Sequence, residues 1–402
     1  MRAGRGRNLI PAAAALLFCG CGAAGEASVP PVPPMTATAD VLDGAVLHYA
    51  EIEVAEEYVG ALVPFSDEYV PARLTYDGTV VEEVGVRLKG HSSAQGLDGK
   101  PGFSVKTNAF VKGRTLKGVK KFTLNNGVQD ASGLHEHVSY EVWRRAGVAA
   151  HGTALARVTF NGTFYGVYTA SEAYDGAFLK SVFGDDSGNL YEGAPGVAVV
   201  DADALELHTN EEENDRSDVL ALGEALLSCP DDGLEDALEP LVDLDAFLSY
   251  WAVEAVVNHW DGYAAQREDG LGEPNNYYVY CVPADHRFVF LPHGADQTLR
   301  GLEDPATALP CEGSRLARRL AEWEPTRERY RARLRQVLDL AWDARALLAR
   351  VDAAYALVAG SVLEEGARRP DAYPSFAKAV AELRDFIRRR RAAVIAELDA
   401  AE

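Results

Sequence analysis

The sequence VVNHWDGY at residues 256–263 ends an apolar run with an aspartate, Asp261. Further along, FLPHGADQT at residues 290–298 ends a strand-like run with a second aspartate, and NNYYVY at residues 275–280 begins a strand with asparagine. Phosphoryl transfer uses groups in this order. One carboxylate orients the attacking hydroxyl, an amide helps to hold a metal ion, and a second carboxylate carries the metal beside the phosphates. These stretches therefore predict a phosphoryl-transfer site, although the HRD and DFG words of protein kinases are absent.

Asp261 and Asp296 are the predicted catalytic residues. Asp261 follows a long apolar helix and precedes Gly262, a placement that presents a carboxylate from rigid structure. It would accept a hydrogen bond from a Ser or Thr hydroxyl and orient that hydroxyl for attack. Asp296 would bind a metal ion and orient the phosphates. Asn276 is the predicted second metal ligand, and Asn275 is a near-equal alternative.

The first residues predict where the protein works. Residues 1–20 form a signal peptide, with arginines followed by a short apolar run that cannot span a bilayer as a mature helix. Cys21 is typical of the lipidated residue of a bacterial lipoprotein, with Cys19 as the alternative. Residues 21–40 are rich in Pro and Ala and predict an extended tether. We therefore expect an extracytoplasmic protein of the bacterial cell envelope, lipid-anchored at the outer membrane and touching the membrane only through that anchor.

The chain is acidic, with a formal net charge of −22. Nucleic-acid binding depends on Lys and Arg that neutralise backbone phosphates. The only basic tract lies near the end, at residues 388–391. The composition therefore argues against nucleic acid as a partner.

Three cysteines follow Cys21, at Cys229, Cys281 and Cys311. An oxidising compartment would permit one disulfide and leave one thiol. We expect Cys281 to pair with Cys311, although sequence alone does not fix the connectivity.

The pattern of apolar residues predicts an α+β protein. Residues 41–170 read mainly as strands, with one helix over 132–146 and a hairpin joined by Asn161 and Gly162. Residues 171–402 read mainly as helices, with one hairpin at 276–291. The helices expected there cover residues 177–182, 217–228, 233–259, 314–323, 325–349 and 374–400.

Short sequence words in a fixed order resemble the spore-coat CotH kinase family. They are VRLKGHSS (86–93), FSVK (103–106), LNN (124–126) with Asp130 and Ser132, NG and YGVY (161–168), GNLYE (188–192), Asp261 with NNYYVY, PHGADQT (292–298) and FIRRRR (386–391). No single word is specific, but their order spans almost the whole mature chain. The resemblance implies a diverged protein-kinase-like fold, with a β-rich N-lobe and a helical C-lobe. It also implies an enzyme that uses ATP with Mg²⁺ or Mn²⁺ to phosphorylate Ser or Thr hydroxyls of a protein substrate.

The resemblance also implies a nucleotide site. Its predicted residues are Gly90, Ser92, Ser93, Lys106 and Glu172. The Gly-Ser turn lies between strand-like runs and would close over phosphates through backbone N–H groups and hydroxyls, although a plain hairpin turn is the alternative. Lys106 stands at the end of an alternating strand, where a kinase places its phosphate-pairing lysine. Glu172 stands where a hinge would join the two lobes.

Two assignments near this site stay open at the level of sequence. The carboxylate partner of the lysine would come from the helix 132–146, as either Glu136 or Glu141. Asp175 would either reach the ribose or cap the short helix that follows it.

The chain departs from the family at one word. The usual pattern resembles Pro-Trp-Asp-x-Asp, whereas this chain has His293 in place of the Trp and Gly294 in place of the first Asp. Histidine is a poorer partner than a carboxylate for a hard cation such as Mg²⁺. The predicted function is therefore an atypical Ser/Thr protein kinase. The alternative is a pseudokinase that acts as a cell-surface binding or assembly protein.

Overall fold

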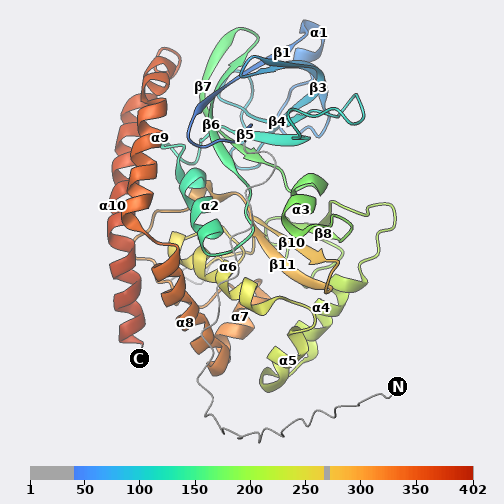
Figure 1. Ribbon diagram of the computed structural model, residues 1–402, viewed down its shortest axis with the longest axis vertical. Coiled ribbons are helices and arrows are strands. Elements are labelled where there is room, and N and C mark those ends of the chain that lie inside the picture. The colour runs from blue at the N-terminus through green and yellow to red at the C-terminus, as the bar shows by residue number, and fades with distance from the viewer. Residues whose placement is uncertain (1–39, 267–271, 402) are drawn as a thin grey trace, which may run out of the picture. The chain divides into compact units, whose positions relative to one another are not determined.

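The computed structural model describes residues 40–266 and 272–401. The predicted signal peptide, Cys21 and the tether up to residue 39 lie outside the described residues. The described part is a mixed α+β structure in which strands dominate the first part and helices dominate the rest (Figure 1). The predicted α+β class is confirmed.

The N-terminal strands close into a seven-stranded barrel in the order β1-β2-β3-β4-β5-β7-β6. The barrel closes where β1 pairs with β6, and this pairing is parallel. All the other neighbouring strands of the barrel are antiparallel. Alternate residues of β1 and β2 are buried, as a barrel with a filled interior requires. The sequence pattern predicted strands but not this closure. The strands are β1 (Leu47–Val54), β2 (Val70–Tyr76), β3 (Thr79–Lys89), β4 (Gly102–Lys106), β5 (Lys121–Asn125), β6 (Thr153–Phe160) and β7 (Thr163–Glu172).

The predicted Asn-Gly hairpin is confirmed between β6 and β7. Asn161 and Gly162 both have positive φ, at 44° and 74°, which is the conformation that favours this pair in a two-residue turn. The Asn161 side chain accepts a hydrogen bond from the Val54 N–H at 2.8 Å and donates one to the Val54 carbonyl at 2.9 Å. The turn therefore also fixes the end of β1.

Helix α2 (His135–Arg145) is shorter at its start than the predicted 132–146. Asp130 and Ser132 precede it as capping residues. Asp130 accepts hydrogen bonds from the Ser132 and His135 N–H groups, and Ser132 Oγ accepts one from the Leu134 N–H. Helix α2 contacts the barrel strand β6 on one side and helix α6 on another, so it links the two parts of the chain.

The second part contains a four-stranded sheet in the order β11-β10-β8-β9. The predicted hairpin at 276–291 corresponds to β10 and β11, which two further strands extend. The strands are β8 (Leu190–Gly193), β9 (Glu206–Leu207), β10 (Tyr277–Val282) and β11 (Arg287–Pro292). The helices are α3 (Gly176–Phe183), α4 (Ser217–Ser228), α5 (Leu234–Leu238), α6 (Leu244–Val257), α7 (Arg315–Glu322), α8 (Glu324–Leu340), α9 (Ala344–Glu365) and α10 (Ala372–Ala400), with a short α1 (Glu56–Val59) before β2 and 3-10 turns η1 (Asp231–Gly233) and η2 (Ala295–Gln297).

Two predicted helices are wrong as continuous elements. The segment 233–259 divides into α5 and α6, because Asp243 caps a new helix by accepting a hydrogen bond from the Ala246 N–H. The segment 325–349 divides in the same way at Asp343, which accepts from the N–H groups of Arg345 and Ala346. In both cases an aspartate inside the predicted helix is the N-cap of a new helix.

Helices α9 and α10 lie side by side along one edge of Figure 1. Among the described residues, α9 is the one helix long and apolar enough to cross a membrane, by length and composition alone. Its buried positions include Leu347, Val351, Ala354 and Val358, which recur at helical spacing. A core helix with one buried face passes the same length and composition test.

The expected disulfide is wrong. Cys229, Cys281 and Cys311 are free thiols. Cys281 lies in β10, where burial and then Asp218 raise the pKa of its thiol to about 12. Cys311 Sγ lies 3.0 Å from Ser314 Oγ.

Candidate functional site

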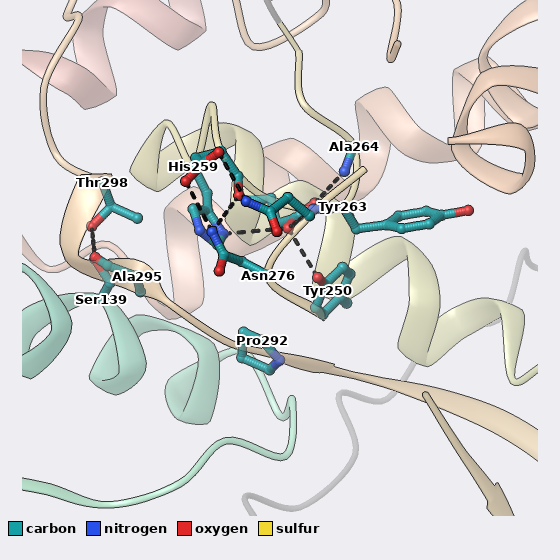
Figure 2. Close-up of polar contacts among 12 residues, drawn as sticks. Ser139, Tyr250, His259, Tyr263, Ala264, Asn276, Pro292, Ala295 and Thr298 are labelled. Atoms are coloured by element: carbon teal, nitrogen blue, oxygen red, sulfur yellow. Dashed lines mark hydrogen bonds and ion pairs between the residues drawn. The ribbon is translucent and has the colours of Figure 1, made fainter. Parts of the chain in front are cut away.

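Asp261 lies on a turn that is fixed by hydrogen bonds to Glu254. Glu254, 2% exposed, accepts hydrogen bonds from the Tyr250 hydroxyl and the Tyr263 N–H, both at 2.9 Å. Its second oxygen accepts one from the Ala264 N–H at 3.0 Å (Figure 2). A Cβ at Gly262 would lie 2.2 Å from Glu254 Oε1, so this turn requires glycine. The main chain around Asp261 is therefore fixed by a buried carboxylate of the preceding helix.

The side chain of Asp261 is surrounded by amides. Asn275 Nδ2 donates to Oδ1 at 3.1 Å, and Asn276 Nδ2 donates to Oδ2 at 3.0 Å and to the Asp261 carbonyl at 2.8 Å. Gln297 Nε2 donates to Oδ2 at 3.3 Å. These bonds bring Asp261, Asn276 and the turn that carries Asp296 to one place. These donors fix the orientation of the carboxylate, as a group that orients a hydroxyl requires.

The unusual Gly294 lies directly against Asn276. Gly294 has φ +54°, and a Cβ built there would meet Asn276 Oδ1 at 2.3 Å. His293 precedes it, with its ring packed edge-on against Tyr278. Burial lowers the pKa of His293 to about 4, against the effect of Glu192. Its Nδ1 is buried and has no hydrogen-bond partner among the described residues.

Asp296 lies in η2, which helix α2 holds. His135 Nδ1 lies 3.0 Å from the Asp296 carbonyl, and Ser139 Oγ lies 2.7 Å from Thr298 Oγ1. Thr298 Oγ1 in turn donates to the Ala295 carbonyl (Figure 2). The Asp296 side chain faces other acids. Burial and then Asp130 raise its pKa, and Lys89 and His259 oppose that rise.

Lys89, at the end of β3, is the cation of this cluster. Its Nζ donates to Asn125 Oδ1 at 2.5 Å, and Asn125 Nδ2 donates to Glu136 Oε2 at 2.5 Å. Burial lowers the pKa of Lys89, while Glu136, Asp296 and Glu192 act in the opposite direction. Of the two carboxylates left open by the sequence, Glu136 belongs to the cluster. Glu141 instead pairs with Arg144 and Arg145.

The residues fit a divalent cation. Burial and then Asp296 raise the pKa of Glu136 to about 7, so Glu136 and Asp296 are two acids that interact in one buried place. Glu136 and Asp296 lie near Lys89, and Asp130 lies near both of these carboxylates. Carboxylate oxygens are the ligands that Mg²⁺ and Mn²⁺ prefer. Asp296 and Asn276, whose Oδ1 faces Gly294, are the residues that would hold the ion.

The structure does not bring Lys106 to this cluster, although the sequence interpretation placed Lys106 in the nucleotide site. Lys106 is exposed, and its Nζ lies 5.9 Å from the centre of the Tyr69 ring. In the β3–β4 ladder Lys106 is opposite Gly85, whereas Lys89 is opposite Gly102. Four residues of strand, about 13 Å, separate the two positions on the same face. Lys89, and not Lys106, therefore lies near Glu136 and Asp296.

The predicted turn Gly90-His91-Ser92-Ser93 directly follows Lys89. Gly90 has φ +118°, and a Cβ there would lie 2.8 Å from Ser93 Oγ. Asn126 Nδ2 donates to the Ser93 carbonyl at 3.0 Å, and Gln129 Nε2 donates to Ser92 Oγ at 3.4 Å. The turn is thus tied to the segment that leads into α2. Phosphate contact by Gly90, Ser92 and Ser93 stays a prediction.

Glu172 lies at the end of β7, where the chain leaves the barrel. It is 3% exposed, and its N–H donates to the Gly152 carbonyl at 3.4 Å. Two residues on, the Tyr174 hydroxyl donates to the Pro292 carbonyl at 2.6 Å, which ties this connection to β11. Asp175 is the N-cap of α3 and accepts from the Ala177 and Phe178 N–H groups. The capping alternative for Asp175 is confirmed, and nucleotide contact by Glu172 stays a prediction.

Sequence reasoning missed three site residues: Lys89, Asn125 and Asp130. All three lie within words that it used for the family resemblance. Lys89 carried a signal, because Val84, Val86 and Leu88 alternate into the barrel and leave Lys89 on the outer face next to the turn. The roles of Asn125 and Asp130 depend on contacts with α2 that no spacing reveals.

Comparison with known proteins gives one match and one negative result. A search of curated proteins finds no match. The family model described as CotH kinase protein matches residues 86–394, which include the residues of the cluster. The match covers well over half of the sequence. This chain therefore belongs to the CotH kinase protein family.

Proposed function

We propose that this protein is an ATP-dependent kinase that transfers the γ-phosphate to Ser or Thr of an extracytoplasmic protein. The observation that carries the proposal is the group of carboxylates Glu136 and Asp296, with Lys89 and Asp130 near both, beside Asp261 with its amide hydrogen bonds. Membership of the kinase family supports the reaction class. We also propose that the barrel and the helical part correspond to the two lobes of a protein-kinase-like fold.

The residues divide the work as phosphoryl transfer requires. Asp261 accepts the hydrogen bond of the substrate hydroxyl and directs its oxygen toward the phosphorus. Lys89 donates to phosphate oxygens, and Glu136 limits its position through Asn125. Asp296 and Asn276 would hold Mg²⁺ or Mn²⁺, and the bound ion neutralises phosphate charge. The turn at Gly90, Ser92 and Ser93 covers the phosphates, and the chain near Glu172 meets the adenine.

We further propose that the mature protein is attached to the outside of the outer membrane through lipid on Cys21. The support is the N-terminal sequence, with its short apolar run and the cysteine that follows. Intact mass of the membrane-extracted protein tests this. Diacylglyceryl and N-acyl additions on Cys21 are expected, and an unmodified mature N-terminus elsewhere would contradict the assignment.

One observation favours a second candidate function, a pseudokinase that acts as a binding or assembly protein. Gly294 replaces a carboxylate that the family pattern carries. Its positive φ and its contact with Asn276 leave little room for a side chain. In this alternative the cluster holds a cation or nucleotide without transfer.

Incubation of the full chain in detergent with γ-labelled ATP and either Mg²⁺ or Mn²⁺ separates the two candidates. A kinase should label itself or an added basic protein. Asp261→Asn should retain nucleotide binding and reduce labelling by about 100-fold or more, since a positioned acid–base group contributes on that scale.

Asp296→Asn provides the second arm of this experiment. It should weaken metal-dependent nucleotide binding itself, because it removes a charge from the proposed metal site. Nucleotide binding by the wild type without any labelling would favour the pseudokinase. Binding of neither nucleotide nor metal would contradict both candidates.

A further inference from the structure

The four consecutive arginines of α10, residues 388–391, do not share one environment. Arg389 is half-exposed and pairs with Asp385 and Glu303. Arg391 bonds to Asp339 and to the Leu338 carbonyl. Arg390 is 1% exposed and is among the largest fully buried side chains. A guanidinium this deeply buried needs acceptors that compensate its lost hydration.

The acceptors of Arg390 are main-chain carbonyls on two separate segments. Nη2 donates to Ala255 at 2.7 Å and Nε donates to Val256 at 3.2 Å, both at the end of α6. Nη1 donates to Leu302 at 2.9 Å and to Asp304 at 2.8 Å. The C-terminal end of a helix also carries the negative end of its dipole, which favours a cation. Arg390 therefore closes the end of α6 and attaches a second segment to it.

Each of these segments leads to one of the two predicted catalytic aspartates. The α6 end runs through Asn258 and His259 into Asp261, and the other segment follows Asp296 along the chain. Further bonds cross between them. The Leu299 N–H donates to the Val257 carbonyl at 2.6 Å, and Asn258 Nδ2 donates to the Arg300 carbonyl at 2.5 Å. Gly301 must be glycine here, because a Cβ would meet Asn258 Nδ2 at 2.6 Å.

We propose that Arg390 is a positioning residue for phosphoryl transfer, which holds the Asp261 turn and the Asp296 turn in a fixed relation. The inference rests on the proposed function for its catalytic consequence. The link that Arg390 makes between the end of α6 and the segment after Asp296 rests on the hydrogen bonds alone. Arg390 touches none of the reacting groups, so its effect passes through the main chain. Displacement of a catalytic group by a fraction of an ångström to 1 Å is enough to slow an enzyme by up to about 100-fold.

The test compares Arg390→Gln with Arg389→Gln in the full chain. Arg389 has the same chemistry one position earlier, but it lies on the exposed side of α10. Arg390→Gln is expected to lower turnover by about 10-fold or more and to raise the KM for ATP, because it displaces the Asp261 turn and the Asp296 turn together. Arg390→Lys keeps the charge but lacks the fork that spans two segments, so it should give an intermediate turnover. Arg389→Gln should leave both constants unchanged.

Hydrogen exchange supplies a readout that does not depend on activity. In Arg390→Gln the amides of His259 and Leu299, whose hydrogen bonds lie on the two segments, should exchange faster than in the wild type. Amides of the barrel, such as those of β3, should not change. Faster exchange spread over the whole chain would show a merely structural role and overturn the proposal. Unchanged exchange at both amides would overturn it as well.

The two kinds of failure remain distinguishable. A wild-type chain without phosphotransfer would contradict the proposed function, and with it the catalytic part of this inference. The exchange pattern would still decide whether Arg390 links the two segments. A wild type that transfers phosphate, with Arg390→Gln equally active, would overturn the positioning role alone.

Discussion

Lys89 and Lys100 are two lysines of the same barrel region whose pKa values burial lowers, but their surroundings differ. Lys100 is buried, and its Nζ donates to both oxygens of Glu365, at 3.0 and 3.2 Å. Lys89 donates to an amide, Asn125, while Glu136 and Asp296 act on it through space. Lys100 therefore bonds directly to one carboxylate, whereas Lys89 bonds to an amide and lies near several carboxylates.

The difference separates a structural ion pair from a binding site. Glu365 also accepts the Val167 N–H, and Gly166 has φ +127° with no room for a Cβ beside the Glu365 carboxylate. This pair joins the end of α9 to β7 with every polar atom satisfied. Near Lys89, burial and neighbouring carboxylates raise the pKa of Glu136 and of Asp296, as is common at functional sites.

The largest effect is expected from a substitution of Glu365, the partner of Lys100. Glu365→Ala leaves Lys100 buried without its partner, which should lower the free energy of unfolding by about 3–5 kcal/mol. Chemical denaturation monitored by circular dichroism measures the change. Glu364→Ala is the matched control, since the neighbouring Glu364 is exposed and pairs with Arg157. It should have a far smaller effect. Equal effects of the two variants would contradict the distinction between the lysines.

The next largest effect is expected from a substitution of Lys89. Lys89→Met should leave the fold intact and reduce phosphotransfer by about 100-fold or more, the scale of one lost electrostatic donor in an active site. Lys106→Met is its control and should retain activity, because Lys106 is exposed at the far end of the same ladder. A kinase assay of both variants checks this. Loss of activity in Lys106→Met, with Lys89→Met active, would restore the original sequence assignment.

This exchange of lysines shows what the sequence could and could not predict. Local patterns predicted the Asn-Gly hairpin and α4 (217–228), because turn chemistry and apolar spacing act over a few residues. The order of Asp261, Asn276 and Asp296 predicted a shared site. The hydrogen bonds of Asp261 join it to Asn276 and to Gln297, the residue after Asp296. The choice between Lys89 and Lys106 depended on strand register, which local pattern does not fix.

Long-range contacts account for the other misses. Barrel closure requires β1 to pair with β6, about a hundred residues away, in parallel. Arg390 appeared as one of four similar arginines, and only the packing of α10 against α6 distinguishes it. The expected disulfide failed for the same reason, since cysteine count says nothing about which side chains meet.

A smaller effect is expected where a carboxylate is added to the cluster. Gly294→Asp restores the carboxylate of the family pattern, but the φ of Gly294 is +54°, which an Asp adopts at a cost. The variant should lose about 1–2 kcal/mol of stability from the left-handed backbone. It should also displace Asn276, whose Oδ1 would lie 2.3 Å from the new Cβ. Gly294→Ala is the control, because it should lose the same stability from the left-handed backbone but adds no charge. Higher metal affinity in Gly294→Asp than in Gly294→Ala would show that the missing carboxylate is functional.

The smallest effect concerns Glu192, a further acid near Lys89 that has its own cation. His208 Nε2 lies 2.7 Å from Glu192 Oε2. Burial opposes the charge of Glu192, but the hydrogen bond from His208, together with His293 and Tyr278, outweighs burial and lowers the pKa of Glu192 from 4.5 to about 2. Burial also opposes the charge of His208, and Glu192 raises its pKa above 6.5. Glu192 therefore stabilises the fold above pH 4.5 and loses this contribution as the pH falls toward 2. His208 contributes fully below pH 6.5 and loses its contribution as the pH rises through its raised pKa.

The pair should accordingly stabilise most between about pH 4.5 and 6.5, the window in which both groups are charged in either state. His208→Gln should cost about 1 kcal/mol there, the scale of a partly exposed pair, and less at higher and lower pH. Urea denaturation of the wild type and the variant at a series of pH values measures this difference. A pH-independent difference would mean that His208 stabilises by packing alone. Glu192 would then be one more carboxylate near Lys89 without a cation of its own, and the surroundings of Lys89 would differ even more from those of Lys100.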